Sequence, residues 1–131
     1  MTEEILNSLR EALAARLSDH PEIRFAILYG SATEGANFHD LDVAVFVDRI
    51  AIATRDDLDY SFVLADELEA VVSFPVDVRV INDAPLPFRF NVSRGTPLVV
   101  RDPQAFFAFL ERTWDEYLDF QPVAMQYLRE M

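Results

Sequence analysis

Two aspartates separated by one residue, Asp40 and Asp42, stand at the start of the strongly apolar segment 41–47. In an extended strand such residues point to the same side, so both carboxylates leave one face. Their mutual repulsion is costly unless a cation lies between them. Mg²⁺ prefers oxygen ligands and commonly uses one or two carboxylates together with substrate phosphates. The pair indicates a magnesium site or a solvated strand end, and the adjoining apolar run favours the metal site.

A third aspartate, Asp77, lies in the segment FPVDVRV, where valines alternate with Asp77 and Arg79. If this strand lies beside residues 41–47, Asp77 completes a cluster of three carboxylates. Such a cluster can hold two divalent ions for in-line displacement at phosphorus. The alternative is an ordinary salt bridge between Asp77 and Arg79.

Upstream of the aspartates, Gly30 ends an apolar segment and Ser31 begins the next element. A glycine at this point lets backbone N–H groups and a hydroxyl approach an anion without a Cβ in the way. The pair therefore suits phosphate binding, but it is also typical of an ordinary tight turn. The same two interpretations apply to Gly35.

Helical and alternating periodicities, together with the prolines and glycines that interrupt them, define the elements that must position these residues. We expect a single small layered domain of helices and strands over residues 1–131, with three core strands and a long C-terminal helix. Pro122 should bend or break that last helix. The predicted strands cover residues 23–29, 41–47 and 76–81, with a brief strand at 97–100; the predicted helices cover 3–18, about 54–72, a short stretch within 82–95, and 103 onward.

The charge of the chain limits its partners. The formal net charge is −12 at pH 7, and all eleven basic residues are arginines scattered along the 131-residue sequence. This distribution disfavours direct contact with nucleic acid but accommodates a metal-escorted anionic substrate or a basic protein partner. There is no cysteine, no apolar run approaches the ~20 residues that span a bilayer, and the acidic N-terminus does not resemble a signal peptide. We therefore expect a cytoplasmic protein without membrane contact.

Taken together, Gly30-Ser31, Gly35, Asp40-Leu41-Asp42 and Asp77 resemble the nucleotidyltransferase superfamily of polymerase β type. The chain length and residues 76–122 are similar to its minimal nucleotidyltransferase (MNT) branch, the antitoxins paired with HEPN toxins. The resemblance covers nearly the whole chain. It implies an α+β nucleotidyltransferase fold with a small mixed sheet.

The resemblance also implies an activity: Mg²⁺-dependent transfer of AMP from ATP to a hydroxyl. Gly30 and Ser31 match the positions that hold the triphosphate, and Asp40 and Asp42 match the two metal ligands. Asp77 matches the third carboxylate, which coordinates the catalytic ion and can help deprotonate the attacking group. In the MNT branch the acceptor is a tyrosine of the partner HEPN ribonuclease.

Two other functions stay open. A binding module that keeps the fold could block the toxin sterically, and the strong acidity suits docking on a basic surface. Transfer of AMP to a small molecule is the third possibility, although it usually requires an additional helical domain. The partner-binding face could lie on the last helix, whose aromatic residues are otherwise expected in the core, with residues 123–131 as its main part. That aromatic set is Phe106, Phe107, Trp114, Tyr117 and Phe120, together with Leu110.

Overall fold

A computed structural model of the chain describes residues 3–33 and 39–129, with side chains described as far as residue 120. The strands are β1 (Ile23–Tyr29), β2 (Leu41–Val47), β3 (Val76–Val80) and β4 (Thr96–Val100). The helices are α1 (Glu3–Leu17), α2 (Asp57–Val72), α3 (Leu86–Ser93) and α4 (Pro103–Arg129), with the 3-10 turns η1 (Gly30–Thr33) and η2 (Thr54–Asp56). These bounds agree closely with the elements that the sequence predicts.

The strands form one mixed sheet in the order β3-β2-β1-β4. β1 pairs antiparallel with both β2 and β4, whereas β2 and β3 run parallel. The α+β fold class is therefore confirmed, but the expectation of three core strands is wrong by one. The local pattern predicts a strand near residues 97–100, yet it cannot reveal that this strand pairs with β1, because that pairing joins segments distant in the chain.

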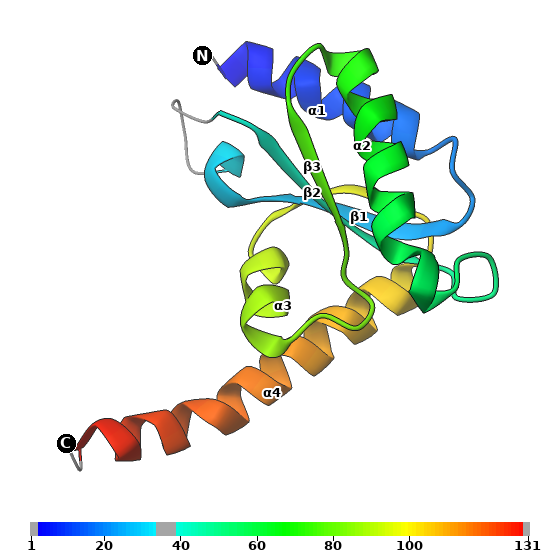
Figure 1. Cartoon of the computed structure of the whole chain (residues 1–131). Helices are drawn as coiled ribbons and strands as arrows, with labels where there is room; N and C mark the ends of the chain where they lie inside the picture. Colours follow the sequence, from blue (N-terminus) through cyan, green and yellow to red (C-terminus); the bar gives the residue numbers. More distant parts are fainter. Residues whose placement is uncertain (1–2, 34–38, 130–131) are drawn as a thin grey trace.

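Helices cover both faces of the sheet (Figure 1). One buried cluster joins α1 and α2 to the face that carries Ala26 and Leu28 of β1. The other joins α3 and α4 to the opposite face, which carries Phe25 and Ile27. Because both faces are covered, β1 is apolar along almost its whole length instead of alternating between apolar and polar residues. The central strands are thus held rigidly, and side chains at their ends have fixed positions.

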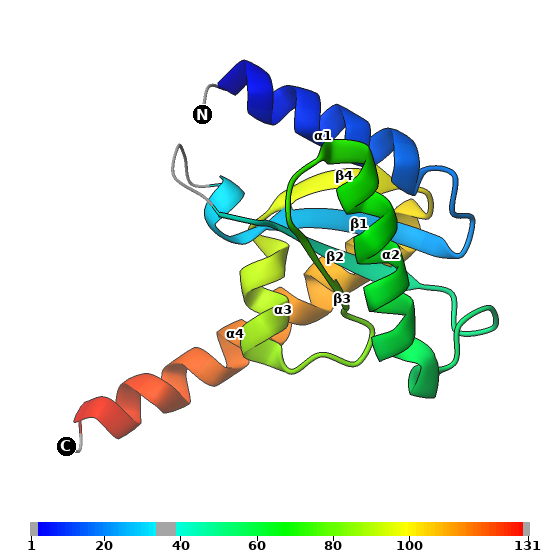
Figure 2. The same cartoon turned by 45° about the horizontal axis from the view of Figure 1, so that its top comes forward.

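Helix α4 begins as predicted and ends differently. The Ala105 backbone N–H donates to Asp102 Oδ1 at 3.1 Å, which caps the helix start. The helix continues through Pro122, so of the predicted bend or break the break is wrong, and the bend stays a prediction. Pro122 removes only the bond to the carbonyl of Leu118, and Leu118 is exposed, so water can reach that part of the helix. The C-terminal half of α4 extends beyond the rest of the chain (Figures 1 and 2).

The aromatic residues of α4 only partly meet the expectation of a core. Phe109 is buried against β1, and Phe106 packs beside it. Three of the residues expected in the core are instead exposed: Phe107, Trp114 and Phe120. Within the described part of the chain, no helix has the length and apolar character needed to cross a membrane.

Candidate functional site

The parallel pairing of β2 and β3 brings two of the candidate carboxylates together. Asp42 on β2 lies at the same register position as Asp77 on β3. Residues paired in this way on strands ~4.8 Å apart point to the same face of the sheet. The condition that the sequence left open, namely that residues 76–81 lie beside 41–47, is therefore met. Asp40 stands just before β2 and is partly exposed.

The three aspartates influence one another electrostatically. Burial, together with the charges of Asp40 and Asp77, raises the pKa of Asp42 to about 6, against an opposing effect of Arg79. Tyr29, which pairs with Asp42 across β1 and β2, responds to the same charges. Burial and then the Asp42 charge raise the pKa of Tyr29, so its phenol stays protonated beside the carboxylates. The arrangement concentrates negative charge at the end of β2.

Three arginines near the candidate site, Arg79, Arg89 and Arg94, have different surroundings. Arg79 Nε lies 3.3 Å from Asp77 Oδ2, so the predicted salt bridge exists on the same strand as the candidate carboxylate. Arg89 is buried and bonded to Thr113 and Glu116 of α4, which gives it a structural role. Arg94 lies against the ring of Phe90 at the end of α3, close to the glycine turn. Of the three, Arg79 and Arg94 face the candidate site.

Gly30 is required at its position for two reasons. Its φ of +80° lies in the left-handed region that favours glycine. In addition, a Cβ there would lie 2.5 Å from Asp42 Oδ2, so that carboxylate would have to move away. The hydroxyl of Thr33 donates to the Gly30 carbonyl at 2.7 Å and closes the turn, while Ser31 is exposed on it. Gly35 lies outside the described residues.

A polar hollow of about 280 Å³ opens beside this turn. Gly30 and Thr33 line it from η1, and Asn91 and Arg94 line it from α3. Arg94 supplies positive charge where the sequence predicts phosphate binding at Gly30 and Ser31. The local sequence of α3 gives no sign of this juxtaposition, because it depends on the packing of α3 across the end of β1.

The chemistry of the carboxylate group suits Mg²⁺. Within the described residues, no group of three or more acidic or histidine side chains is spaced to hold a metal ion by itself. Mg²⁺ does not require such a cage, because it commonly binds one or two carboxylates and completes its shell with water and substrate phosphates. Burial first, and then the charges of Asp40 and Asp77, raise the pKa of Asp42, and a nearby cation would favour its ionised form. Asp40 and Asp42 are the residues that fit this role.

A carboxylate pair beside a glycine turn can hold a divalent ion next to a phosphate group. Residues 11–104 match the family model described as "Polymerase beta, Nucleotidyltransferase". The chain belongs to this nucleotidyltransferase family. A search of curated proteins found no match.

Several solved structures share the fold. A chain from the structure of a tri-AMPylated Shewanella oneidensis HEPN toxin in complex with MNT antitoxin is 22% identical, with a TM-score of 0.63, covering 94% of this chain and 96% of that one. A chain from a toxin–antitoxin structure with AMP-PNP is 20% identical, with a TM-score of 0.62 and coverages of 99% and 98%. A chain from the toxin–antitoxin MntA-HepT is 19% identical, with a TM-score of 0.60 and coverages of 98% and 97%. At these identities the likeness is one of fold.

Proposed function

We propose that this nucleotidyltransferase is an Mg²⁺-dependent adenylyltransferase that acts as an antitoxin, transferring AMP from ATP to a tyrosine hydroxyl of a HEPN toxin. The observation that carries the proposal is the pairing of Asp42 with Asp77 next to Gly30 in a chain of this family. Similar folds in complexes with an AMPylated HEPN toxin and with AMP-PNP support the choice of acceptor and nucleotide.

Each residue has a distinct task in this proposal. Asp40 and Asp42 would hold Mg²⁺, which when bound neutralises phosphate charge and makes the α phosphorus more electrophilic. Gly30 and Ser31 would hold the phosphates, with Arg94 adding positive charge from α3. Asp77 would accept a hydrogen bond from the attacking hydroxyl and take its proton. The hydroxyl oxygen forms a bond to the α phosphorus, the bond to the bridging oxygen breaks, and pyrophosphate leaves.

The direct test combines the purified chain with ATP, Mg²⁺ and its cognate HEPN protein, followed by intact-protein mass spectrometry. We expect the HEPN protein to gain one or more AMP masses, and the Asp42→Ala variant to lower the rate by about 100-fold or more because the site loses its main charge. If the wild-type chain leaves the mass of the HEPN protein unchanged, and the Asp42→Ala variant still neutralises the toxin, the enzymatic proposal is wrong.

A binding module that neutralises the toxin sterically is the second candidate, and helix α4 favours it. Phe107, Trp114 and Leu118 are exposed along one side of this helix. Glu111 precedes Trp114 by three residues and Asp115 precedes Leu118 by three, so these acidic side chains are their neighbours on the helix surface. Apolar side chains bordered by acids suit a basic partner. This function predicts a complex that weakens with salt and is indifferent to ATP and to Asp42→Ala, which separates it from catalysis.

A further inference from the structure

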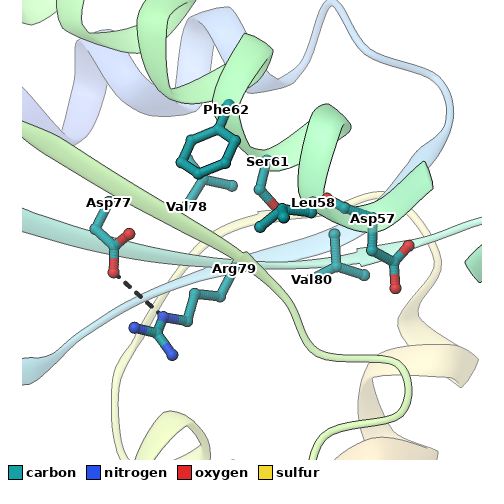
Figure 3. Close-up of a pocket in the computed structure, with 8 residues that line it drawn as sticks. All are labelled: Asp57, Leu58, Ser61, Phe62, Asp77, Val78, Arg79 and Val80. Atoms are coloured by element: carbon teal, nitrogen blue, oxygen red, sulfur yellow. Dashed lines mark hydrogen bonds and ion pairs between the residues drawn. The ribbon is translucent and has the colours of Figure 1, made fainter. Parts of the chain in front are cut away.

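The outer side of β3 carries an open groove of about 490 Å³ that ends at a candidate catalytic residue (Figure 3). Leu58 and Phe62 project from α2 along one wall, and Val78 lies beneath them. Asp77 and Arg79 lie on the opposite side of the strand and are joined by their ion pair. The groove therefore has an apolar wall on one side and the candidate proton acceptor on the other.

The groove continues along β3 past Arg79. A second hollow of about 360 Å³ shares Asp57, Arg79 and Val80 with the first and reaches Phe88 at the start of α3. β3 is an edge strand of the sheet, so no further strand covers this side. A long open trough is the shape that accommodates an extended polypeptide segment, whereas a compact small ligand is usually enclosed on most sides.

The charges that border the groove are already paired within the chain. Asp57 Oδ1 lies 2.6 Å from Arg49 Nη1, and Asp77 Oδ2 lies 3.3 Å from Arg79 Nε. The groove thus offers little unpaired charge to a basic segment, and its attraction comes from the apolar wall. Leu58 is 66% exposed and Phe62 is 62% exposed, which leaves their apolar surface available to a partner.

The groove and the polar hollow beside Gly30 are separate openings near the carboxylates. The hollow lies at Gly30, where an added Cβ would meet Asp42, and it shares no lining residue with the groove. The groove meets the carboxylates at Asp77. Transfer to phosphorus requires the attacking and leaving oxygens to lie roughly in line on opposite sides of the phosphorus. Separate openings for the nucleotide, at Gly30, and for the acceptor, at Asp77, are compatible with this requirement.

We propose that the groove between α2 and β3 binds the acceptor protein, as an extended segment whose aromatic side chain rests against Leu58 and Phe62 and directs its hydroxyl to Asp77. This inference rests on the proposed function and adds the place where its protein substrate docks. The hydroxyl oxygen attacks the α phosphorus of ATP, its proton passes to Asp77, and pyrophosphate leaves with the electrons of the broken P–O bond. Leu58 and Phe62 determine acceptor affinity and take no part in the chemistry.

The chain provides a matched control for this proposal. Val63 follows Phe62 on α2 and is 70% exposed, but it does not line the groove. Phe62→Ser and Val63→Ser therefore remove exposed apolar side chains from adjacent positions of one helix. Because both side chains are exposed, neither change should prevent folding, and matching thermal melts would confirm this.

The experiment measures binding and transfer with the cognate HEPN protein. For Phe62→Ser, and for Leu58→Ser, we expect about 10-fold weaker binding by titration calorimetry and a similar rise in KM for the HEPN protein. Affinity for a non-hydrolysable ATP analogue should not change, and Val63→Ser should behave as wild type. Equal affinity of Phe62→Ser and Val63→Ser for the HEPN protein would overturn the proposal that the groove binds the acceptor. If wild type transfers no AMP, the proposed function fails, while the binding comparison still decides whether the partner uses the groove.

Discussion

Two groups of acidic residues in this chain have opposite electrostatic character. At the end of β2 and β3, Asp42 lies beside Asp77, and its pKa is raised to about 6 by burial and by neighbouring carboxylates. Between α1 and α2, His20 contacts Glu22 through Nδ1 at 2.9 Å and Glu67 through Nε2 at 2.5 Å. Burial opposes ionisation of these two glutamates, yet hydrogen bonds outweigh it and lower the pKa of both.

The difference shows where the negative charge of the chain serves the fold and where it serves a ligand. Tyr60 donates to Glu22 at 2.5 Å, and Arg16 lies 2.9 Å from Glu67. The two glutamates of this group, which we call the helix cluster, therefore have their partners within the chain. Among the described residues, the favourable charge acting on the pKa of Asp42 comes from Arg79, which is itself paired with Asp77. The strand-end group is therefore left with a repulsion that an external cation would relieve, whereas the helix cluster is complete.

The largest effect is expected from replacing Gly30 with alanine, which breaks the strand-end arrangement directly. The new Cβ would meet Asp42 Oδ2, and alanine disfavours the observed φ of +80°. We expect a loss of about 1–2 kcal/mol in the free energy of unfolding, measured by urea titration, and loss of AMP transfer. Ser31→Ala, which keeps the backbone conformation, is the control and should retain wild-type stability. A Gly30→Ala variant with wild-type stability and AMP transfer would mean that the Asp42 carboxylate is not confined beside Gly30.

A smaller effect of opposite sign is expected for Asp42→Asn. Asparagine keeps the size of the side chain but removes the repulsion from Asp40 and Asp77. In metal-free buffer at pH 7 we expect the free energy of unfolding to rise by about 0.5 kcal/mol while transfer activity is lost. Differential scanning fluorimetry, with and without Mg²⁺, measures this. If Asp42→Asn is less stable than wild type in metal-free buffer, Asp42 stabilises the fold. The contrast drawn between the strand-end carboxylates and the glutamates around His20 would then be wrong.

The smallest effect is expected in the group formed by His20, Glu22 and Glu67, when the pH is lowered. Glu22 and Glu67 have pKa values below the ordinary 4.5, so their contribution to stability is present above about pH 4.5 and is lost as the pH falls further. Glu67→Gln should therefore lower the free energy of unfolding at pH 7 by about 0.3 kcal/mol. The difference from wild type should shrink below pH 4.5, as followed by urea titration at several pH values. A difference that is independent of pH would mean that Glu67 acts only through packing.

Local patterns predict much of this molecule, because they depend on neighbours in sequence. Alternation in FPVDVRV predicts β3, and the Asp102-Pro103 pair predicts the start of α4. The proximity of Asp42 and Asp77 is predicted only conditionally, since it requires β2 and β3 to be adjacent and in register. The roles that Asp40, Asp42, Asp77, Gly30 and Ser31 take in catalysis stay predictions.

Features that depend on tertiary packing escape the sequence. Arg89 could equally well have been a phosphate ligand, and only the packing of α3 on α4 shows that it pairs with Glu116. Tyr29 gives no sign of its proximity to Asp42 until β1 and β2 are paired. The apolar wall of Leu58 and Phe62 resembles the buried stripe of any amphipathic helix. Its exposure becomes evident only when β3 is seen at the edge of the sheet.

The C-terminal half of α4 extends beyond the rest of the chain (Figures 1 and 2). A helix of 27 residues is about 40 Å long, so its end stands well away from the carboxylates. A partner bound to that helix would stay attached while its acceptor segment leaves the groove between α2 and β3 and returns. Such attachment keeps the local concentration of the acceptor high. Under the proposed function, such a tether would let the same partner return its acceptor segment to the site without a new diffusional encounter.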